Sequence, residues 1–384
     1  MKQIPYGRHH ISEEDIKSVN EVLRSDFLTQ GEKVNEFEKE FANYVGSKYS
    51  VSVANGTAAL HLCALAMDVD NNSRVITSPI SFVATANCVR YCGGEVFFSD
   101  IKSNDYTLDE EKVAELLSKH PKRYFQGIIP IDFAGRPANM PALRKLAEEY
   151  DCWIIEDACH APGGSGEFNG QTWKCGDGQY AELAIFSFHP VKHIACGEGG
   201  MITTNDSALY KKLLMLRSHG ITKDPNSICS DDGWYYEMQL LGYNYRLSDI
   251  HASLGLSQLR NADWGLSRRI EIARMYDRAF NSNKKIVSHS GYYPGHAYHL
   301  YIIEIENRKG LYDYLRENNV YAQIHYIPIH LQPYYRQFGW QKNDFPVSEQ
   351  YYKRCLSIPM FPSLTDKEVN YIIDLVEHFL ENEV

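Results

Sequence analysis

The stretch SVSVANGTAALHLCALAM, residues 50–67, indicates the fold class of this chain. Its first part, SVSVAN, alternates apolar and small polar residues and predicts a strand. Its second part, from Thr57 onward, is rich in Ala and Leu, which are strong helix formers, and predicts a helix. A strand that passes into a helix at Asn55-Gly56 is typical of the repeating unit of an α/β sheet.

The same alternation continues through the next part of the chain, over roughly a hundred residues. Predicted strands cover 73–79, 93–101, 124–133 and 152–159, and predicted helices cover 81–92, 109–119 and 140–150. This order predicts an open α/β sheet with helices on both faces. Ligands of such sheets bind at the carboxyl ends of the strands, so polar residues there are candidates for the functional site.

The flanking regions complete the predicted architecture. Ser12 and Asp15 are spaced as an N-terminal cap for a helix over 12–25, and a second amphipathic helix follows near 34–45. Later segments predict two strands, 181–189 and 200–205, that could pair as a hairpin. A long helix over 247–280, two further strands over 298–305 and 321–330, and a last helix over 366–380 follow. We expect two domains, a large one over 1–260 and a small C-terminal one over 261–384, because 384 residues exceed one ordinary domain.

Composition excludes several classes of protein. The net charge of −10 argues against a nucleic-acid partner, because a basic face is needed to neutralise phosphates. Nine cysteines with no CxxC pair predict neither a disulfide framework nor a zinc ribbon. No apolar run approaches the length of a membrane span, and the first residues lack the apolar core of a signal peptide. We therefore expect a reduced cytoplasmic protein with no membrane partner.

Two motifs follow predicted strands directly. In Asn55-Gly56-Thr57-Ala58 the first N–H groups of a helix suit a phosphate, although an ordinary helix cap explains the motif equally simply. In Ile155-Glu156-Asp157-Ala158-Cys159-His160, Asp157 stands where a carboxylate could hold a protonated ring nitrogen. The alternative is that Asp157 caps the next helix and His160 lies on the surface.

Three further motifs carry candidate residues. Phe82 follows a strand and could stack on a flat ring, unless it is a core residue. Lys192 lies between two apolar strands beside a Gly-rich turn; a lysine in a partly apolar pocket is a nucleophile, whereas an exposed loop lysine is inert. Asn244 and Arg246 precede the long helix and could bind an anion or form a polar helix entry.

Taken in order, the motifs describe one cofactor. Pyridoxal phosphate needs a phosphate cradle, a stacking ring, an acid for its ring nitrogen and a lysine for its aldehyde. The sequence supplies Thr57, Phe82, Asp157 and Lys192 in these roles. The histidine pairs at 9–10 and 325/330 lack carboxylate or cysteine partners at ligand spacing, so we expect no metal.

The sequence resembles the DegT/StrS group of nucleotide-sugar aminotransferases. The resemblance covers nearly the whole chain and is carried by residues 27–46, 187–206 and 241–259. It implies the type I fold of pyridoxal-phosphate-dependent transferases, which resembles that of aspartate aminotransferase. A purified protein of this kind is expected to be an aminotransferase rather than a non-catalytic regulator, because no motif is broken.

The resemblance also implies a role for each candidate residue. Lys192 matches the lysine that binds the cofactor's aldehyde, Asp157 the partner of its ring nitrogen, and His160 the residue beside its phenolic oxygen. Phe82 matches the stacking residue. The phosphate cradle is expected from Thr57, the backbone of Ala58, and Ser187, with Asn244 contributed by a neighbouring subunit, so a homodimer with shared active sites is implied.

Within the group, residues 78–87, 187–192 and 324–336 are most similar to enzymes of the pseudaminic acid pathway. The implied reaction moves an amino group from L-glutamate to C4 of a UDP-linked 4-keto-6-deoxy-N-acetylhexosamine. Two alternatives stay open: an aminotransferase for another nucleotide-linked sugar (dTDP- or GDP-4-keto, or 3-keto), and a sugar dehydratase of the same fold. Dehydratases of the group carry His in place of the lysine, so Lys192 favours a transaminase.

Overall fold

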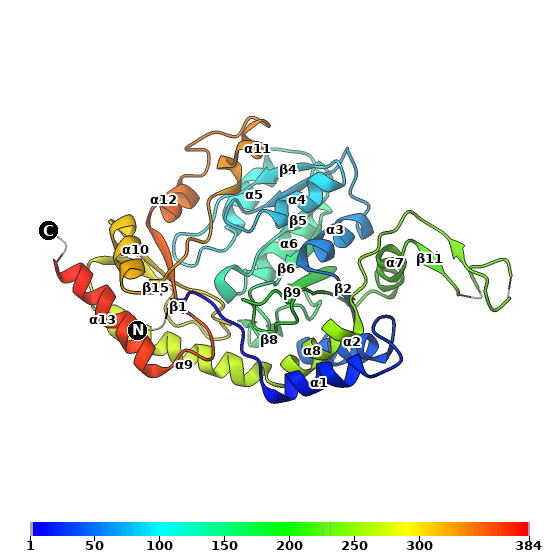
Figure 1. The fold of residues 1–384 in the computed structure, drawn as a ribbon. Coiled ribbons are helices and arrows are strands. Elements are labelled where there is room, and N and C mark those ends of the chain that lie inside the picture. Colours follow the sequence, from blue (N-terminus) through cyan, green and yellow to red (C-terminus); the bar gives the residue numbers. More distant parts are fainter. Residues whose placement is uncertain (1–2, 225, 231, 383–384) are drawn as a thin grey trace.

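The computed structural model describes residues 3–224, 226–230 and 232–382. A seven-stranded sheet forms its centre, with strand order β2-β10-β9-β6-β5-β3-β4 (Figure 1). In that order the strands are β2 (Tyr49–Val53), β10 (Gly200–Thr204), β9 (Leu183–Ser187), β6 (Trp153–Asp157), β5 (Gly127–Ile129), β3 (Arg74–Thr77) and β4 (Glu95–Phe98). The five strands from β9 to β4 are parallel, whereas β10 runs antiparallel to both β9 and β2.

Helices cover both faces of this sheet. They are α2 (Glu32–Val45), α3 (Gly56–Ala66), α4 (Ala84–Tyr91), α5 (Glu110–Ser118), α6 (Met140–Tyr150), α7 (Ser207–Arg217) and α8 (Asp249–Arg260). Ile155 of β6 packs with α3, α4 and α7, whereas its neighbour Ile154 packs with α5 and α6 on the other face. Side chains alternate along a strand, so β6 is buried on both sides. The predicted α/β sheet is confirmed.

The C-terminal part has a core of its own. It contains the antiparallel sheet β13-β14-β16, with β13 (Ile286–His289), β14 (Tyr301–Ile305) and β16 (Cys355–Ile358). The helices α9 (Ala262–Phe280), α10 (Arg308–Glu317) and α13 (Asp366–Asn382) pack with this sheet. Ile4 of β1 (Ile4–Pro5) joins the same core, because β1 pairs with β15 (Val320–Tyr321). The domain boundary near residue 260 remains a prediction.

The smaller elements complete the chain. They are α1 (Glu13–Leu23), η1 (Phe133–Gly135), β7 (Ser165–Phe168), β8 (Gln171–Lys174), β11 (Ile221–Thr222), β12 (Glu237–Met238), η2 (Ile329–Leu331), α11 (Pro333–Arg336) and α12 (Pro346–Arg354). The predicted cap of α1 is confirmed, because Ser12 and Asp15 bond reciprocally to each other's backbone. The hairpin β7–β8 was not predicted, although Asn169-Gly170, with positive φ at both residues, is a strong hairpin signal.

Two predicted elements are wrong. The long helix over 247–280 is two helices, because α8 ends at Arg260 and Asn261 takes a non-helical conformation before α9. Asparagine favours helix ends, since its amide competes with the backbone for hydrogen bonds. The strand over 321–330 pairs at only two of its residues, Tyr321 with Pro5 and Gln323 with Ser357, and Pro328 cannot donate to a ladder. The chain there passes along the cavity described below instead.

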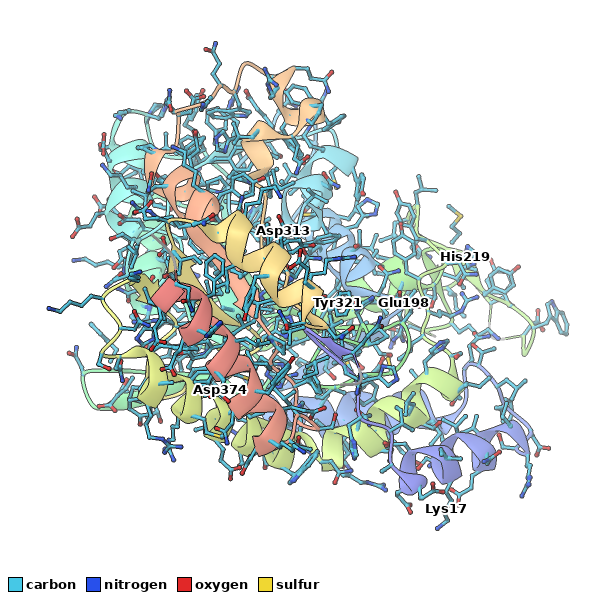
Figure 2. The ribbon with its side chains drawn as sticks, turned by 60° about the vertical axis from the view of Figure 1, so that its left-hand side comes forward. Lys17, Glu198, His219, Asp313, Tyr321 and Asp374 are labelled. Atoms are coloured by element: carbon cyan, nitrogen blue, oxygen red, sulfur yellow. The ribbon has the colours of Figure 1, made fainter. Side chains whose placement is uncertain are left out.

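An arm built on β11 and β12 projects from the molecule. It stands clear of the other elements in both views, with His219 at its base (Figure 1 and Figure 2).

All nine cysteines are unpaired, as expected. Among the helices of the described residues, none is long and apolar enough to cross a membrane.

Candidate active site

One cavity of about 920 Å³ lies at the carboxyl ends of the central strands. This size suits a cofactor or a substrate. The cavity brings together seven of the eight predicted site residues: Thr57, Ala58, Phe82, Asp157, His160, Ser187 and Lys192. Side chains that are up to 135 positions apart in the sequence, from Thr57 to Lys192, therefore meet at one place.

The first turn of α3 forms one wall of the cavity. Asn55 caps the helix, since its Oδ1 accepts the Ala58 N–H at 2.8 Å. A Cβ on Gly56 would lie only 3.0 Å from the Cβ of Ser187, so glycine allows this turn to approach β9 closely. The remaining N–H groups of the first turn have no partner within the helix, and the helix dipole favours an anion there. The cap and the anion-binding interpretations are thus compatible.

Asp157, the last residue of β6, presents a buried carboxylate to the cavity. Its Oδ2 accepts the hydroxyl of Thr85 at 2.7 Å, and its Oδ1 accepts the N–H of Cys159 at 3.2 Å. The Thr85 hydroxyl also lies 2.7 Å from that of Ser81. These bonds orient the carboxylate while leaving it on the cavity wall.

His160 is buried, so its interpretation as a surface residue is wrong. Its Nδ1 accepts the N–H of Ala134 at 3.3 Å, and its Nε2 lies 3.2 Å from the hydroxyl of Tyr326. Burial, and then the positive charge of Lys192, lowers the pKa of His160 well below its ordinary value. The imidazole is therefore neutral, with Nδ1 as the acceptor.

Lys192 lies in the loop between β9 and β10, and its half-buried side chain lines the cavity. Its Nζ is 3.4 Å from Nε2 of His299. Burial lowers the pKa of Lys192, although the nearby Cys159 and Asp157 act in the opposite direction. A lower pKa leaves more of the amine unprotonated, which is the nucleophilic form. Lys192 is therefore not a fully exposed loop lysine, and its role as a nucleophile stays a prediction.

The last two predicted residues, Phe82 and Asn244, are both exposed, but only Phe82 lines the cavity. Phe82 is 58% exposed at the cavity, with its ring centre 6.2 Å from that of Tyr326, so it is not a core residue. Asn244 is exposed near the base of the arm, where it bridges to Ser218, and it does not line the cavity of its own chain. Its neighbour Tyr245 does.

The family model described as the DegT/DnrJ/EryC1/StrS aminotransferase family matches residues 9–377. The chain belongs to this family. It is a pyridoxal-phosphate-dependent aminotransferase, and its fold is the type I fold of these enzymes.

Individual relatives of this aminotransferase match over almost their whole length. The spore coat polysaccharide biosynthesis protein SpsC of Bacillus subtilis is 36% identical, with 98% of this chain and 97% of the relative covered. A UDP-4-amino-4,6-dideoxy-N-acetyl-beta-L-altrosamine transaminase of Campylobacter jejuni is 34% identical, with 98% of each chain covered. The solved structure of Helicobacter pylori PseC, an aminotransferase of pseudaminic acid biosynthesis, is 31% identical, with a TM-score of 0.89 over 100% of both chains.

Several residues of the aminotransferase site were not singled out from the sequence. Thr85, His299 and Tyr326 contact Asp157, Lys192 and His160 respectively. Each belongs to an apolar segment in which nothing local distinguishes it from a core residue. The spacing between partners reaches 166 residues, so only the tertiary structure pairs them.

Arg269 of α9 is a further unpredicted residue of the aminotransferase. It is fully buried, and its Nη1 donates to the carbonyl oxygens of Tyr298, His299 and Met360 at 3.1, 3.3 and 3.0 Å. Burial lowers the pKa of Arg269 to about 9. The guanidinium thereby holds the backbone on both sides of the His299 side chain, next to Lys192.

The cavity of the aminotransferase fits pyridoxal phosphate by the chemistry of its donors. An amine of lowered pKa, a buried carboxylate and a helix N-terminus are the groups that an aldehyde, a ring nitrogen and a phosphate require. The close approach of Gly56 to Ser187 forms a cradle that a larger residue would fill.

Proposed function

We propose that this aminotransferase moves an amino group from L-glutamate to C4 of a UDP-linked 4-keto-6-deoxy-N-acetylhexosamine, for surface-glycan synthesis of the pseudaminic acid type. The observation that supports transamination as the type of reaction is that Lys192, Asp157 and the first turn of α3 line one cavity. The names of the Campylobacter and Helicobacter relatives support the sugar. The similar identity of the spore coat relative makes another nucleotide-linked keto sugar the second candidate.

The cofactor, once bound, supplies a ring that accepts the electrons left when a C–H bond of the substrate is broken. Lys192 would hold its aldehyde, and the freed Nζ would take the proton from the α-carbon of glutamate and return it later. Asp157 would keep the ring nitrogen protonated, because an adjacent negative charge favours the protonated form. Phe82 would cover one ring face, and His160 would lie beside the phenolic oxygen.

The phosphate of the cofactor would be held by Thr57, the Ala58 backbone and Ser187, and it would share the Ala58 N–H with Asn55 Oδ1, which accepts that N–H at 2.8 Å. We propose that Asn244 of a second copy completes this cradle, because Asn244 is exposed outside the cavity of its own chain. The arm beside it exposes Trp234 and Leu241 by 77% and 75%, which suits contact with that second copy. A homodimer with shared sites follows.

The test of the reaction uses Lys192→Ala with Lys211→Ala as the matched control, since Lys211 is exposed on α7. Purified wild type is expected to be yellow, to yield a borohydride-trapped cofactor, and to aminate a keto sugar in the presence of glutamate. Lys192→Ala is expected to lose the trapped adduct and the activity, and Lys211→Ala to keep both. Normal turnover by Lys192→Ala contradicts the proposal.

The substrate is tested with a panel of UDP-, dTDP- and GDP-linked keto sugars, with products read by mass spectrometry. A product heavier by the exchange of C=O for CH–NH2 on the UDP-4-keto sugar supports the assignment. Amination of only a dTDP- or GDP-linked sugar contradicts it. Loss of a hydroxyl without gain of nitrogen indicates the dehydratase instead.

A further inference from the structure

Glu156 and Asp157 are neighbours on β6, and their side chains lie on opposite faces of the sheet. Asp157 faces the cavity. Glu156 faces the other side, where it meets Asp132, which directly precedes η1, and Cys175, which directly follows β8. One carboxylate oxygen of each acid and the Cys175 Sγ lie within 4.8 Å of one another, and all three residues are buried.

Half of each carboxyl group in this cluster is held by the backbone. Asp132 Oδ1 accepts the N–H of Ala138 at 2.9 Å, and Glu156 Oε2 accepts that of Gly176 at 3.1 Å. The remaining oxygens, Asp132 Oδ2 and Glu156 Oε1, have no hydrogen-bond partner among the described residues while both acids are ionised. Two unpaired buried charges of the same sign are costly, and a single proton between them removes the cost.

We propose that Glu156 is a neutral carboxylic acid that shares its proton with Asp132, and that this pair is a positioning device for the active site on the opposite face of the sheet. The shared proton is inferred from the positions of these side chains and does not depend on the proposed function. The positioning role rests on the proposed function.

The pair acts through the turn that follows Asp132. Within this turn, Ala134 donates its N–H to His160 at 3.3 Å and accepts that of Leu300 at 3.1 Å. Leu300 follows His299, whose ring contacts Lys192 at 3.4 Å. The turn therefore bonds to His160 directly and is linked to His299 through the backbone of the next residue, Leu300.

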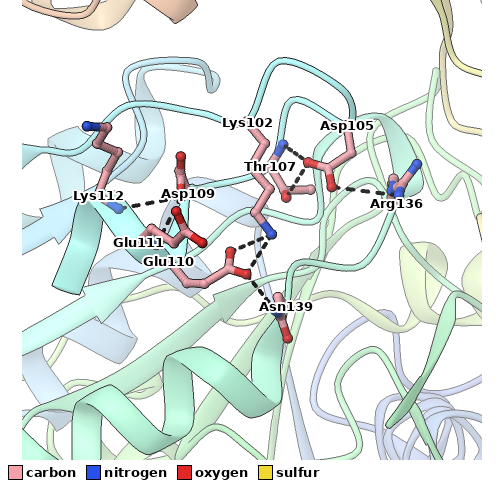
Figure 3. A network of polar contacts seen from close by, with 9 residues as sticks. All are labelled: Lys102, Asp105, Thr107, Asp109, Glu110, Glu111, Lys112, Arg136 and Asn139. Atoms are coloured by element: carbon pink, nitrogen blue, oxygen red, sulfur yellow. Dashed lines mark hydrogen bonds and ion pairs between the residues drawn. The ribbon is translucent and has the colours of Figure 1, made fainter. Parts of the chain in front are cut away.

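The turn has a conformation that needs support, since φ is +59° at Ala134. Its far end is anchored by a surface network, in which Arg136 lies 3.7 Å from Asp105 and Asn139 donates to Glu110 at 2.6 Å (Figure 3). Its near end begins at Asp132. A hydrogen bond from Glu156 to Asp132 would fix that end.

The ionisable groups that act on the pair are Cys175, Asp157 and Asp177, all of them acids. Burial first, and then the charge of Asp132, raises the pKa of Glu156 well above 4.5. Burial raises the pKa of Asp132 to about 6. Burial and neighbouring acids thus both favour a protonated Glu156. A group with a raised pKa in the folded state binds protons that the unfolded chain releases, so its contribution to stability is lost as the pH rises above 4.5.

The shared proton is tested with Glu156→Gln, because the amide can donate to Asp132 and accept from Gly176 as the neutral acid does. The difference in urea midpoint between variant and wild type is expected to grow in favour of the variant from about pH 5 to about pH 8. The infrared band of a protonated carboxylic acid is expected to disappear. Glu167→Gln, at an exposed position of β7, is the control and should change neither.

Two results overturn the shared proton. One is a pH dependence of stability in Glu156→Gln that equals that of the wild type. The other is a stoichiometric divalent metal in the purified protein, found by elemental analysis, that Glu156→Gln loses. Both measurements are independent of any substrate, so a failed sugar panel would leave them intact.

The positioning role is tested by comparing Glu156→Gln with Glu156→Ala, which leaves Asp132 Oδ2 and the Gly176 N–H without partners. We expect kcat to fall roughly tenfold in the alanine variant, with a shifted pH profile of the bound cofactor's absorbance, and to recover with glutamine. Equal impairment of both variants, or normal kcat and an unshifted profile in Glu156→Ala, overturns the role. If the alanine variant does not fold, the pH profile of Asp132→Asn decides in its place: a shifted profile supports the role, and an unshifted one overturns it.

Discussion

Thr85 is the residue through which α4 acts on the active site. Its hydroxyl donates to Asp157 Oδ2 at 2.7 Å from a buried position. A hydrogen bond to an ionised group favours the ionised form, and a bond of this kind contributes about 1.5–3 kcal/mol. The proposed function needs Asp157 ionised, so Thr85 is a positioning residue for it.

We therefore expect Thr85→Val, which keeps the shape and removes the donor, to lower kcat about tenfold and to shift the pH dependence of the cofactor's absorbance. Thr85→Ser should restore both. Thr77→Val is the control, since the buried Thr77 hydroxyl donates only to the Ile129 carbonyl oxygen at 2.8 Å. If both valine variants lose stability and neither shifts the absorbance profile, Thr85 has only a structural role.

At the scale of elements, the β11–β12 arm is a separate two-stranded sheet, and its residues are far less buried than those of the central sheet. Met238 of β12 is 60% exposed, and Trp234 in the preceding loop is more exposed still. The arm leaves Asn244 outside its own cavity, whereas Lys192 lies inside. A second copy would cover these exposed apolar residues, and its cavity would receive the Asn244 amide. An experiment that mixes subunits therefore tests whether Asn244 acts in the site of its partner.

Lys192→Ala and Asn244→Ala, each made separately, are expected to be impaired. Co-expression should produce mixed dimers in which one site has both wild-type residues, so activity should return. The control is co-expression of Lys192→Ala with Asp157→Ala, because these residues share one cavity and no intact site can form. Absence of recovery in the first pair, with mixed dimers demonstrated by mass, places Asn244 in its own chain's site or outside any site.

At the scale of the molecule, neutral histidines collect where the C-terminal part meets the large sheet. Burial lowers the pKa of five of them: His160, His193, His296, His299 and His325. The unfolded chain takes up protons below pH 6.5 that the folded chain cannot. Their contribution to stability is therefore present above that pH and is lost as the pH falls.

His296 offers a clean test, since its pKa is lowered to about 3 and its Nδ1 accepts the Tyr298 N–H at 2.8 Å. Through this residue alone the protein should be about 2 kcal/mol less stable at about pH 5 than at neutral pH. His296→Asn, whose side-chain oxygen can accept the same bond, should reduce this acid sensitivity in urea unfolding. The exposed His378 is the control position, with His378→Gln expected to behave as wild type. If His296→Asn loses as much stability at acid pH as the wild type does, His296 is not the source of this acid sensitivity.

The sequence by itself determined the α/β alternation, the cap of α1 and the places of Lys192 and Asp157, because periodicity, capping and strand ends are local properties. Prediction from the sequence failed where two local signals in the same segment favoured different structures. Asn261 ended a helix within an apolar pattern, and the apolar segment from Ile324 to Ile327 lines a cavity instead of joining a sheet.

Only the tertiary structure decided which polar groups meet. His299 reaches Lys192 across 107 positions, and Tyr326 reaches His160 across 166. Glu156 and Asp157 are adjacent in the sequence, yet the pleat of β6 sends one to a closed acid cluster and the other to the cavity. Contacts across such separations depend on how the whole sheet packs, and no local pattern records them.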